Sequence, residues 1–103
     1  MLFVARFTDK PDIAKRRSEL LQEHFDWLAA NSNRVLLAGS LRTDVGGASL
    51  GGLWIIEAKS KADAESVFQT DPFWVHGLRA KAEVFHYVKA HPEKTSVIRD
   101  TAG

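Results

Sequence analysis

The 103-residue sequence contains no cysteine, and this absence excludes disulfide bonds, thiolate metal ligands and a cysteine nucleophile. It also contains no apolar run close to the roughly 18 residues that a membrane-spanning helix needs. The apolar residues 2–5 are followed at once by Arg6, and this segment is too short for the core of a signal peptide. We therefore expect a cytoplasmic protein that has no membrane partner.

A strong excess of charge of one sign is absent as well. The 14 basic residues nearly balance the 13 acidic residues, which leaves a net charge of +1. The sequence has no basic run, no zinc-ligand spacing and no aromatic motif typical of RNA-binding domains. The glycine pair at 51–52 is too weak a signal for a phosphate loop. We expect no nucleic-acid partner, no metal ion and no cofactor.

What the sequence does contain is a regular succession of apolar segments within the size of one domain. Their spacing predicts helices at 11–31 and from Ser60 to the residues before Pro72. Apolar and alternating runs predict strands at 2–7, 34–41, 50–59 and 78–89.

The predicted order is βαββαβ. It favours a ferredoxin-like α+β fold, in which one four-stranded antiparallel sheet has both helices on one face. We assign residues 1–90 to this domain. Residues 91–103 are polar and contain a proline, and we expect them to form a C-terminal tail.

The long predicted helix has two polar residues within its apolar stripe. The stripe is made of Ile13, Leu20, Leu21 and Leu28. Arg17 and His24 lie on the same side, seven residues apart, and therefore one above the other. A buried cation needs a partner and a buried imidazole needs hydrogen bonds, so we expect polar groups from elsewhere in the chain to reach this stripe.

Asp71 is the candidate partner. It follows the inward-facing spacing of the second predicted helix, and Pro72 ends that helix. If the two helices lie side by side on the sheet, the carboxylate approaches His24 and stabilises its imidazolium form. A structural role stays open for both residues, because an inward histidine is often a hydrogen-bonded core residue and an aspartate before proline is often a turn residue.

One face of the predicted sheet is left uncovered by the helices. We expect Trp54, Ile56, Phe85 and Tyr87 to lie on this face. A bare apolar face of several hundred Å² usually marks an interaction surface. We therefore predict a homodimer that packs sheet against sheet.

Several short segments together resemble the YciI-like (YCII-related) family over residues 1 to about 90. They are the start Met1-Leu2-Phe3-Val4, the helix with Arg17 and His24, the strand Leu37-Ala38-Gly39-Ser40, and Thr70-Asp71-Pro72-Phe73 followed by Gly77-Leu78. The resemblance implies a dimeric α+β barrel of muconolactone-isomerase-like architecture. It also implies an active-site pair, a helix histidine and an aspartate before proline, which are His24 and Asp71 in this sequence.

Two positions depart from the family's pattern. Members often have proline where this chain has Ser40, and arginine where it has Leu20, one turn before the histidine. Arg17 is one turn further away and is the residue that we expect to replace that arginine. We assign substrate contacts to Arg17 and Ser40.

Two functions are consistent with these residues. The first is a cofactor-independent enzyme that uses His24 and Asp71 for proton transfer on a small organic acid or lactone, in isomerase, lyase or hydrolase chemistry. The second is a non-catalytic dimeric module that binds a small ligand or serves another enzyme. An enzyme requires His24 at an open pocket with Asp71 within about 3.2 Å, whereas a structural pair would be sealed.

Overall fold

The computed structural model describes residues 1–90, and the predicted tail at 91–103 lies outside the described residues. The predicted order of strands and long helices is confirmed, and the second helical segment is divided into three short pieces. The elements are β1 (Leu2–Asp9), α1 (Ala14–Ala30), β2 (Val35–Arg42), β3 (Ser49–Glu57), α2 (Lys61–Val67), the 3₁₀ turn η1 (Phe68–Thr70), α3 (Pro72–Val75) and β4 (Arg79–Tyr87).

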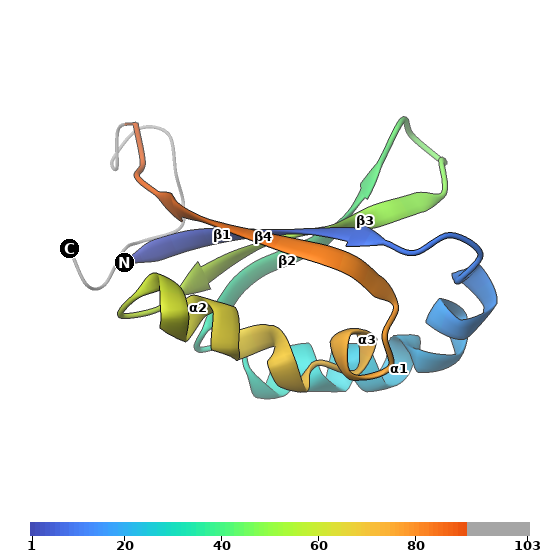
Figure 1. The fold of residues 1–103 in the computed structure, drawn as a ribbon, viewed down its shortest axis with the longest axis horizontal. Coiled ribbons are helices and arrows are strands. Elements are labelled where there is room, and N and C mark those ends of the chain that lie inside the picture. The colour runs from blue at the N-terminus through green and yellow to red at the C-terminus, as the bar shows by residue number, and fades with distance from the viewer. Residues whose placement is uncertain (91–103) are drawn as a thin grey trace.

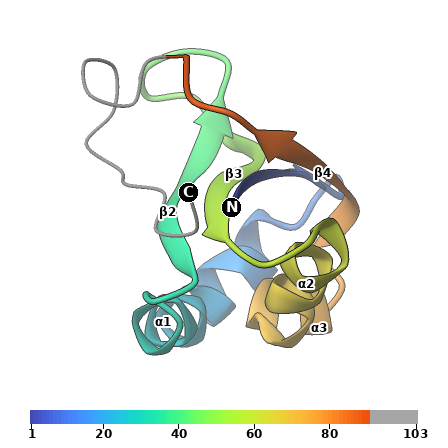
Figure 2. The same ribbon diagram turned by 90° about the vertical axis from the view of Figure 1, so that its left-hand side faces the viewer.

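The four strands form one sheet in the order β2-β3-β1-β4, and every neighbouring pair is antiparallel. All helices lie on the same face of this sheet (Figure 1). Figure 2 shows α1 beside α2 and α3, so that the helices form a single layer below the strands. This is the predicted ferredoxin-like α+β arrangement.

Local sequence signals explain how the second helical segment begins and ends. The Ser60 side chain accepts a hydrogen bond from the backbone N–H of Asp63 at 3.1 Å and caps α2. Asp71 has an extended backbone, with φ −63° and ψ 132°, because the following Pro72 disfavours the helical region. The chain therefore leaves η1 at Asp71 and restarts as α3, which changes the direction of the Asp71 side chain relative to α2.

The main core lies between the sheet and the helices. Phe7 packs against Trp54 and Phe68, with ring centroids 4.8 and 5.0 Å apart. Trp54 and Ile56 are almost fully buried in this core, since they pair with Ala5 and Phe3 on the inner face of β1. The prediction that Trp54 and Ile56 lie on the uncovered face is therefore wrong. Residues 53–56 are all apolar, so their pattern did not show which alternating set faces the helices.

The opposite face of the sheet keeps exposed apolar side chains. Phe85 and Tyr87 on β4 are 51% and 45% exposed, and Leu37 and Leu41 on β2 are 55% and 37% exposed. The predictions for Phe85 and Tyr87 thus agree with the structure.

An ion pair between β1 and β4 lies on this outer face. Arg6 donates two hydrogen bonds to Glu83 Oε1, from Nε at 3.2 Å and Nη2 at 2.9 Å. The hydrogen bonds from Arg6 are the main cause that lowers the pKa of Glu83 below its ordinary value. Since the folded-state pKa of Glu83 is the lower one, its stabilising contribution is present above the unfolded-state pKa and is lost as the pH falls through the folded-state pKa.

We predict that Arg6→Gln raises the pKa of Glu83 toward its ordinary value. Lys81→Gln is the matched control, because Lys81 Nζ lies 3.7 Å from the same carboxylate oxygen and should have a smaller effect. An NMR titration of the Glu83 side-chain carboxyl measures its pKa in the wild-type protein and in each of the two variants. An unchanged pKa in Arg6→Gln would show that this ion pair does not form in solution.

Candidate active site

The His24 and Asp71 side chains meet between α1 and the start of α3. His24 Nδ1 lies 2.6 Å from Asp71 Oδ1, and the two residues are 6% and 1% exposed. With Asp71 as a carboxylate, Nδ1 keeps its proton and donates a hydrogen bond to Oδ1. The other ring nitrogen, Nε2, is then the one with a free lone pair. It has no hydrogen-bond partner within residues 1–90.

Packing around this pair restricts the orientation of the imidazole ring. The ring of Phe73 stacks on His24, with centroids 4.0 Å apart and planes 8° apart. Trp27 Nε1 donates a hydrogen bond to Thr70 Oγ1 at 2.9 Å, which joins α1 to the residue just before Asp71. The backbone N–H groups of Trp74 and Val75 donate to the Asp71 carbonyl oxygen and hold the turn that presents the carboxylate.

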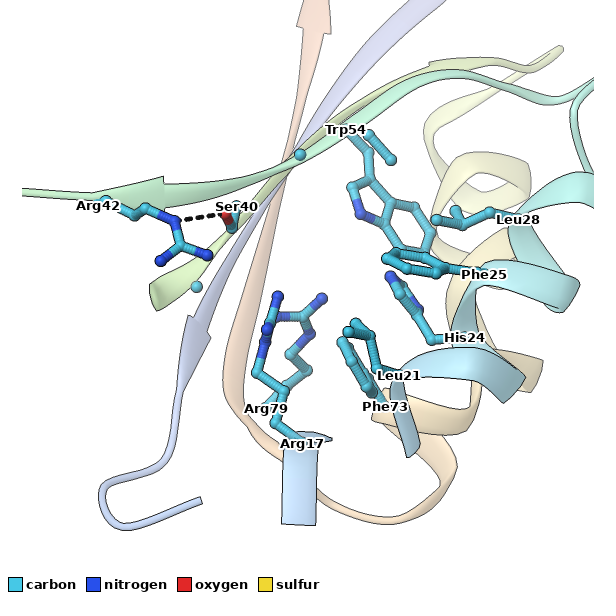
Figure 3. Close-up of a pocket in the computed structure, with 13 residues that line it drawn as sticks. Arg17, Leu21, His24, Phe25, Leu28, Ser40, Arg42, Trp54, Phe73 and Arg79 are labelled. Atoms are coloured by element: carbon cyan, nitrogen blue, oxygen red, sulfur yellow. Dashed lines mark hydrogen bonds between the residues drawn. The ribbon is translucent and has the colours of Figure 1, made fainter. Parts of the chain in front are cut away.

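His24 lines an open pocket between α1 and the inner face of the sheet (Figure 3). The pocket has a volume of about 240 Å³, which suits a small organic molecule. Its walls combine aromatic, aliphatic and cationic side chains with the glycine backbone of two strands. The lining residues are Arg17, Leu21, His24, Phe25, Leu28, Ala38, Gly39, Ser40, Arg42, Gly51, Trp54, Phe73 and Arg79.

Arg79 enters the pocket from the start of β4. Its Nη1 donates to Asp9 Oδ1 at 2.6 Å, and both side chains are 4% exposed. The guanidinium carbon lies 4.7 Å from the ring centroid of Phe7 and 5.2 Å from that of Phe73. Such distances are typical of cation–π contacts. The charge of Arg79 is therefore held in place by one carboxylate and two aromatic rings.

Arg17 lies next to Arg79. Its guanidinium carbon is 5.4 Å from the Phe73 ring centroid, and its Nε is buried without a hydrogen-bond partner in the described part of the chain. Burial is the main cause that lowers the pKa of Arg17; Asp9 raises it, and repulsion by Arg79 and Arg42 lowers it further. Arg17 is thus a half-buried cation whose carboxylate neighbour is already bound to Arg79.

The structure brings all four sequence-predicted site residues to one place. His24 contacts Asp71, and Arg17 and Ser40 line the pocket that His24 faces. Ser40 Oγ accepts a hydrogen bond from Arg42 Nε at 3.0 Å. Their catalytic and substrate-binding roles stay predictions. The pocket is also lined by Arg42, Arg79 and Trp54, which no sequence pattern had indicated as site residues.

Two kinds of feature are absent from the described residues: clusters of metal ligands and membrane-spanning helices. Within residues 1–90, no cluster of three or more His, Asp or Glu side chains has an arrangement that could hold a metal ion. In the same residues, no helix combines the length and the apolar character required to cross a bilayer.

Comparison with known families identifies the chain's relatives. A model of the YCII-related domain matches residues 1–88, nearly the whole of the described structure. The chain belongs to the YCII-related family. The family resemblance expected from the sequence is thereby confirmed, and with it the ferredoxin-like fold. No curated protein matches the chain in sequence.

Among solved structures, a YciI-like enzyme is similar over most of both chains. It is 5-chloro-2-hydroxyhydroquinone dehydrochlorinase (TftG) from Burkholderia phenoliruptrix AC1100, in complex with 2,5-dihydroxybenzoquinone. The TM-score is 0.76 at 25% sequence identity, and the match covers 85% of this chain and 94% of that enzyme. This YCII-related chain is therefore similar in structure to an enzyme that binds a small molecule.

Two more distant structures also match. Rv0793 from Mycobacterium tuberculosis covers 85% of this chain and 94% of its own, and At3g17210 from Arabidopsis thaliana covers 87% and 95%. Each has a TM-score of 0.47 and 14% identity, and neither contributes to the functional argument.

Proposed function

We propose that this YCII-related protein is an enzyme that catalyses proton transfer on a small organic acid. In this proposal His24 exchanges the proton with the substrate and Asp71 orients the imidazole. The observation that carries the proposal is the buried 2.6 Å contact between His24 Nδ1 and Asp71 Oδ1 at the wall of an open pocket. A sealed pair would have no route to a substrate, whereas His24 forms part of the pocket lining.

The arrangement fits the requirements of general acid–base catalysis. A base must have a free lone pair, and Asp71 leaves that lone pair on Nε2 by accepting the hydrogen bond that Nδ1–H donates. When Nε2 takes up a proton, the ring becomes an imidazolium, and the adjacent carboxylate stabilises its positive charge. Asp71 is therefore a positioning residue, and His24 is the proposed catalytic residue.

The similarity to TftG favours elimination among the reaction types that such a pair can support. In an elimination, Nε2 of His24 accepts a proton from the substrate, and the electron pair of the broken bond forms the new double bond. The leaving group departs as an anion with the electron pair of its own bond. Arg17 and Ser40 lie in the same pocket, where they can contact the substrate.

The test is an activity screen with the intact protein. Chlorinated hydroxyhydroquinones, chlorinated carboxylic acids and lactones are incubated with the protein, and chloride release and proton release are recorded separately. We expect at least one compound to give a signal with the wild-type protein and a much smaller one with His24→Gln. Compounds that bind without turnover in the wild-type protein would instead support a non-catalytic ligand-binding module.

We also propose that the protein is a homodimer that uses the outer face of its sheet. The exposed apolar side chains of Phe85, Tyr87, Leu37 and Leu41 support this proposal, since no helix covers them in the described structure. Burial of several large apolar side chains gives a substantial driving force for association.

Sedimentation at micromolar concentration should therefore give twice the chain mass of 11.5 kDa. Phe85→Asp is expected to shift the protein toward monomer, because it places a charge in the proposed interface. Val75→Asp is the matched control, since Val75 is 61% exposed but belongs to the helical layer. A wild-type monomer, or equal dissociation of both variants, would contradict this interface.

A further inference from the structure

The pocket has more positive charge than its carboxylates neutralise. Three arginines, Arg17, Arg42 and Arg79, line it, and Asp9 is bound to only one of them. Within residues 1–90, neither Arg17 nor Arg42 forms an ion pair with a carboxylate. Asp71 is bound to His24. The pocket therefore keeps a net positive charge, and Arg17 and Arg42 are its two arginines without a bound carboxylate.

These charges lie together on one side of the pocket. Figure 3 shows the guanidinium groups of Arg17 and Arg79 side by side, with Arg42 beyond them and His24 on the opposite side. Both Arg17 and Arg79 also contact the ring of Phe73, at 5.4 and 5.2 Å. Arg79 and Arg42 repel the charge of Arg17, and a bound anion would lower this electrostatic energy.

The Arg79 side chain is buried within the fold and does not extend from its surface. Its Nε is buried and has no hydrogen-bond partner in residues 1–90. Gly52 on β3 leaves the space for this guanidinium, because a Cβ there would lie 3.4 Å from Arg79 Nη2 and 3.1 Å from the Gly39 carbonyl oxygen. The guanidinium is therefore fixed at the pocket wall, where its positive charge can attract an anion.

The remaining walls restrict the shape of a ligand. Trp54, Phe25 and Phe73 surround the space between His24 and the arginines (Figure 3). Aromatic side chains favour contact with flat ring systems by stacking. The pocket thus combines an aromatic wall, of which Phe25 is the exposed member at 51%, with positive charge on one side and a proton-transfer group on the other.

We infer that the pocket binds a planar ring compound as a dianion, with its acidic oxygens against Arg17, Arg42 and Arg79 and its ring between the aromatic walls. This inference rests on the proposed function and names the substrate class. A dianion can pair with both Arg17 and Arg42, which have no bound carboxylate, whereas a monoanion can pair with only one of them. A neutral ring leaves both unpaired. The same arginines stabilise the extra negative charge that develops when His24 removes a proton from the bound ring.

Isothermal titration calorimetry with three ring compounds of similar size tests this inference without an activity assay. The probes are isophthalate, a dianion at neutral pH, benzoate, a monoanion, and benzamide, which is neutral. We expect isophthalate to bind the wild-type protein about tenfold more tightly than benzoate, and benzamide to bind most weakly. The isophthalate affinity should fall with increasing salt concentration.

Matched arginine variants separate local contacts from the general effect of net charge. Arg17→Gln and Arg42→Gln are each expected to weaken isophthalate binding about tenfold. In each variant the ratio of the isophthalate affinity to the benzoate affinity should also decrease. Arg42 is exposed, so its variant tests the same site with little risk to folding. Arg16→Gln is the control, because Arg16 is the neighbouring arginine on α1 but is exposed and paired with Glu19. It should change the affinity less than twofold.

The outcomes distinguish this inference from the proposed catalysis. Dianion selectivity in a protein without turnover would preserve the inference while the proposed catalysis fails. Equal affinities for the three probes, no binding of isophthalate at millimolar concentration, or equal losses in Arg16→Gln and Arg17→Gln would each overturn the inference.

Discussion

Replacement of His24 by glutamine is expected to reduce turnover by about 10²–10⁴-fold, the usual contribution of a general acid–base group. Glutamine removes the titratable ring but keeps an N–H donor that can reach the Asp71 carboxylate. His24→Leu would be a poorer test. It would leave Asp71, which is 1% exposed, as a buried carboxylate without its partner.

Asp71→Asn is the companion variant. We expect a similar loss of turnover, because a neutral amide cannot stabilise the imidazolium that forms when His24 takes up a proton. The measurement is the initial rate of chloride or proton release, with circular dichroism as the control for folding. Thr70→Val is the matched structural control. It removes the hydrogen bond from Trp27 beside Asp71 without altering the proposed acid–base pair. Full activity in His24→Gln would exclude the proposed catalytic role.

The second large effect concerns stability. Arg79→Leu is expected to lower the free energy of unfolding by about 3–5 kcal/mol, since it leaves the Asp9 carboxylate buried and unpaired. The two side chains are 4% exposed and their charged atoms are 2.6 Å apart, so water cannot replace the lost partner. Urea denaturation followed by circular dichroism measures the loss.

The double variant Asp9→Leu/Arg79→Leu separates the cost of an unpaired buried charge from the cost of lost side-chain packing. It should recover most of the stability that Arg79→Leu loses, because no unpaired charge remains in the core. Arg17→Leu is the control for the loss of an arginine from the same pocket. It should cost much less, because its guanidinium has no ion pair within residues 1–90. A double variant as unstable as the sum of the single variants would show that the two side chains do not interact.

The same residue links stability to binding. Replacing a buried ion pair by apolar side chains is often neutral or even stabilising. The Asp9–Arg79 pair therefore does not have to increase stability. In our inference its function is to place Arg79 in the anion-binding pocket. We expect the double variant to be stable and to bind isophthalate more weakly, because it has lost one of the three arginines that line the pocket.

Much of the fold could be predicted from the sequence because its signals are local. The capping serine at 60, the proline at 72 and the apolar spacing along 11–31 each act within a few residues. The order of the elements followed from these signals, and that order is compatible with few topologies. The approach of His24 to Asp71 could be predicted as well, because it depends only on helix periodicity and on two helices lying side by side.

The face of β3 could not be predicted in the same way. Residues 53–56 are all apolar, so no alternation of polar and apolar residues shows which side faces solvent. Trp54 and Ile56 were therefore predicted on the wrong face. Only the register with β1, in which Ala5 is opposite Trp54, decides which set faces the helices. Register is a long-range property and is not visible in one strand.

The orientation of Arg79 depends on long-range strand pairing. Strict alternation along β4 places it on the outer face with Phe85 and Tyr87. The pairing of β1 with β4 shifts between Thr8 and Asp9, and such an irregularity inserts an extra residue that reverses the alternation. Arg79 therefore points inward to Asp9. Short-range backbone preferences were enough to predict the βαββαβ order and the approach of His24 to Asp71. The inward position of Arg79 depends instead on its pairing with Asp9, 70 positions away, a distance that no local pattern spans.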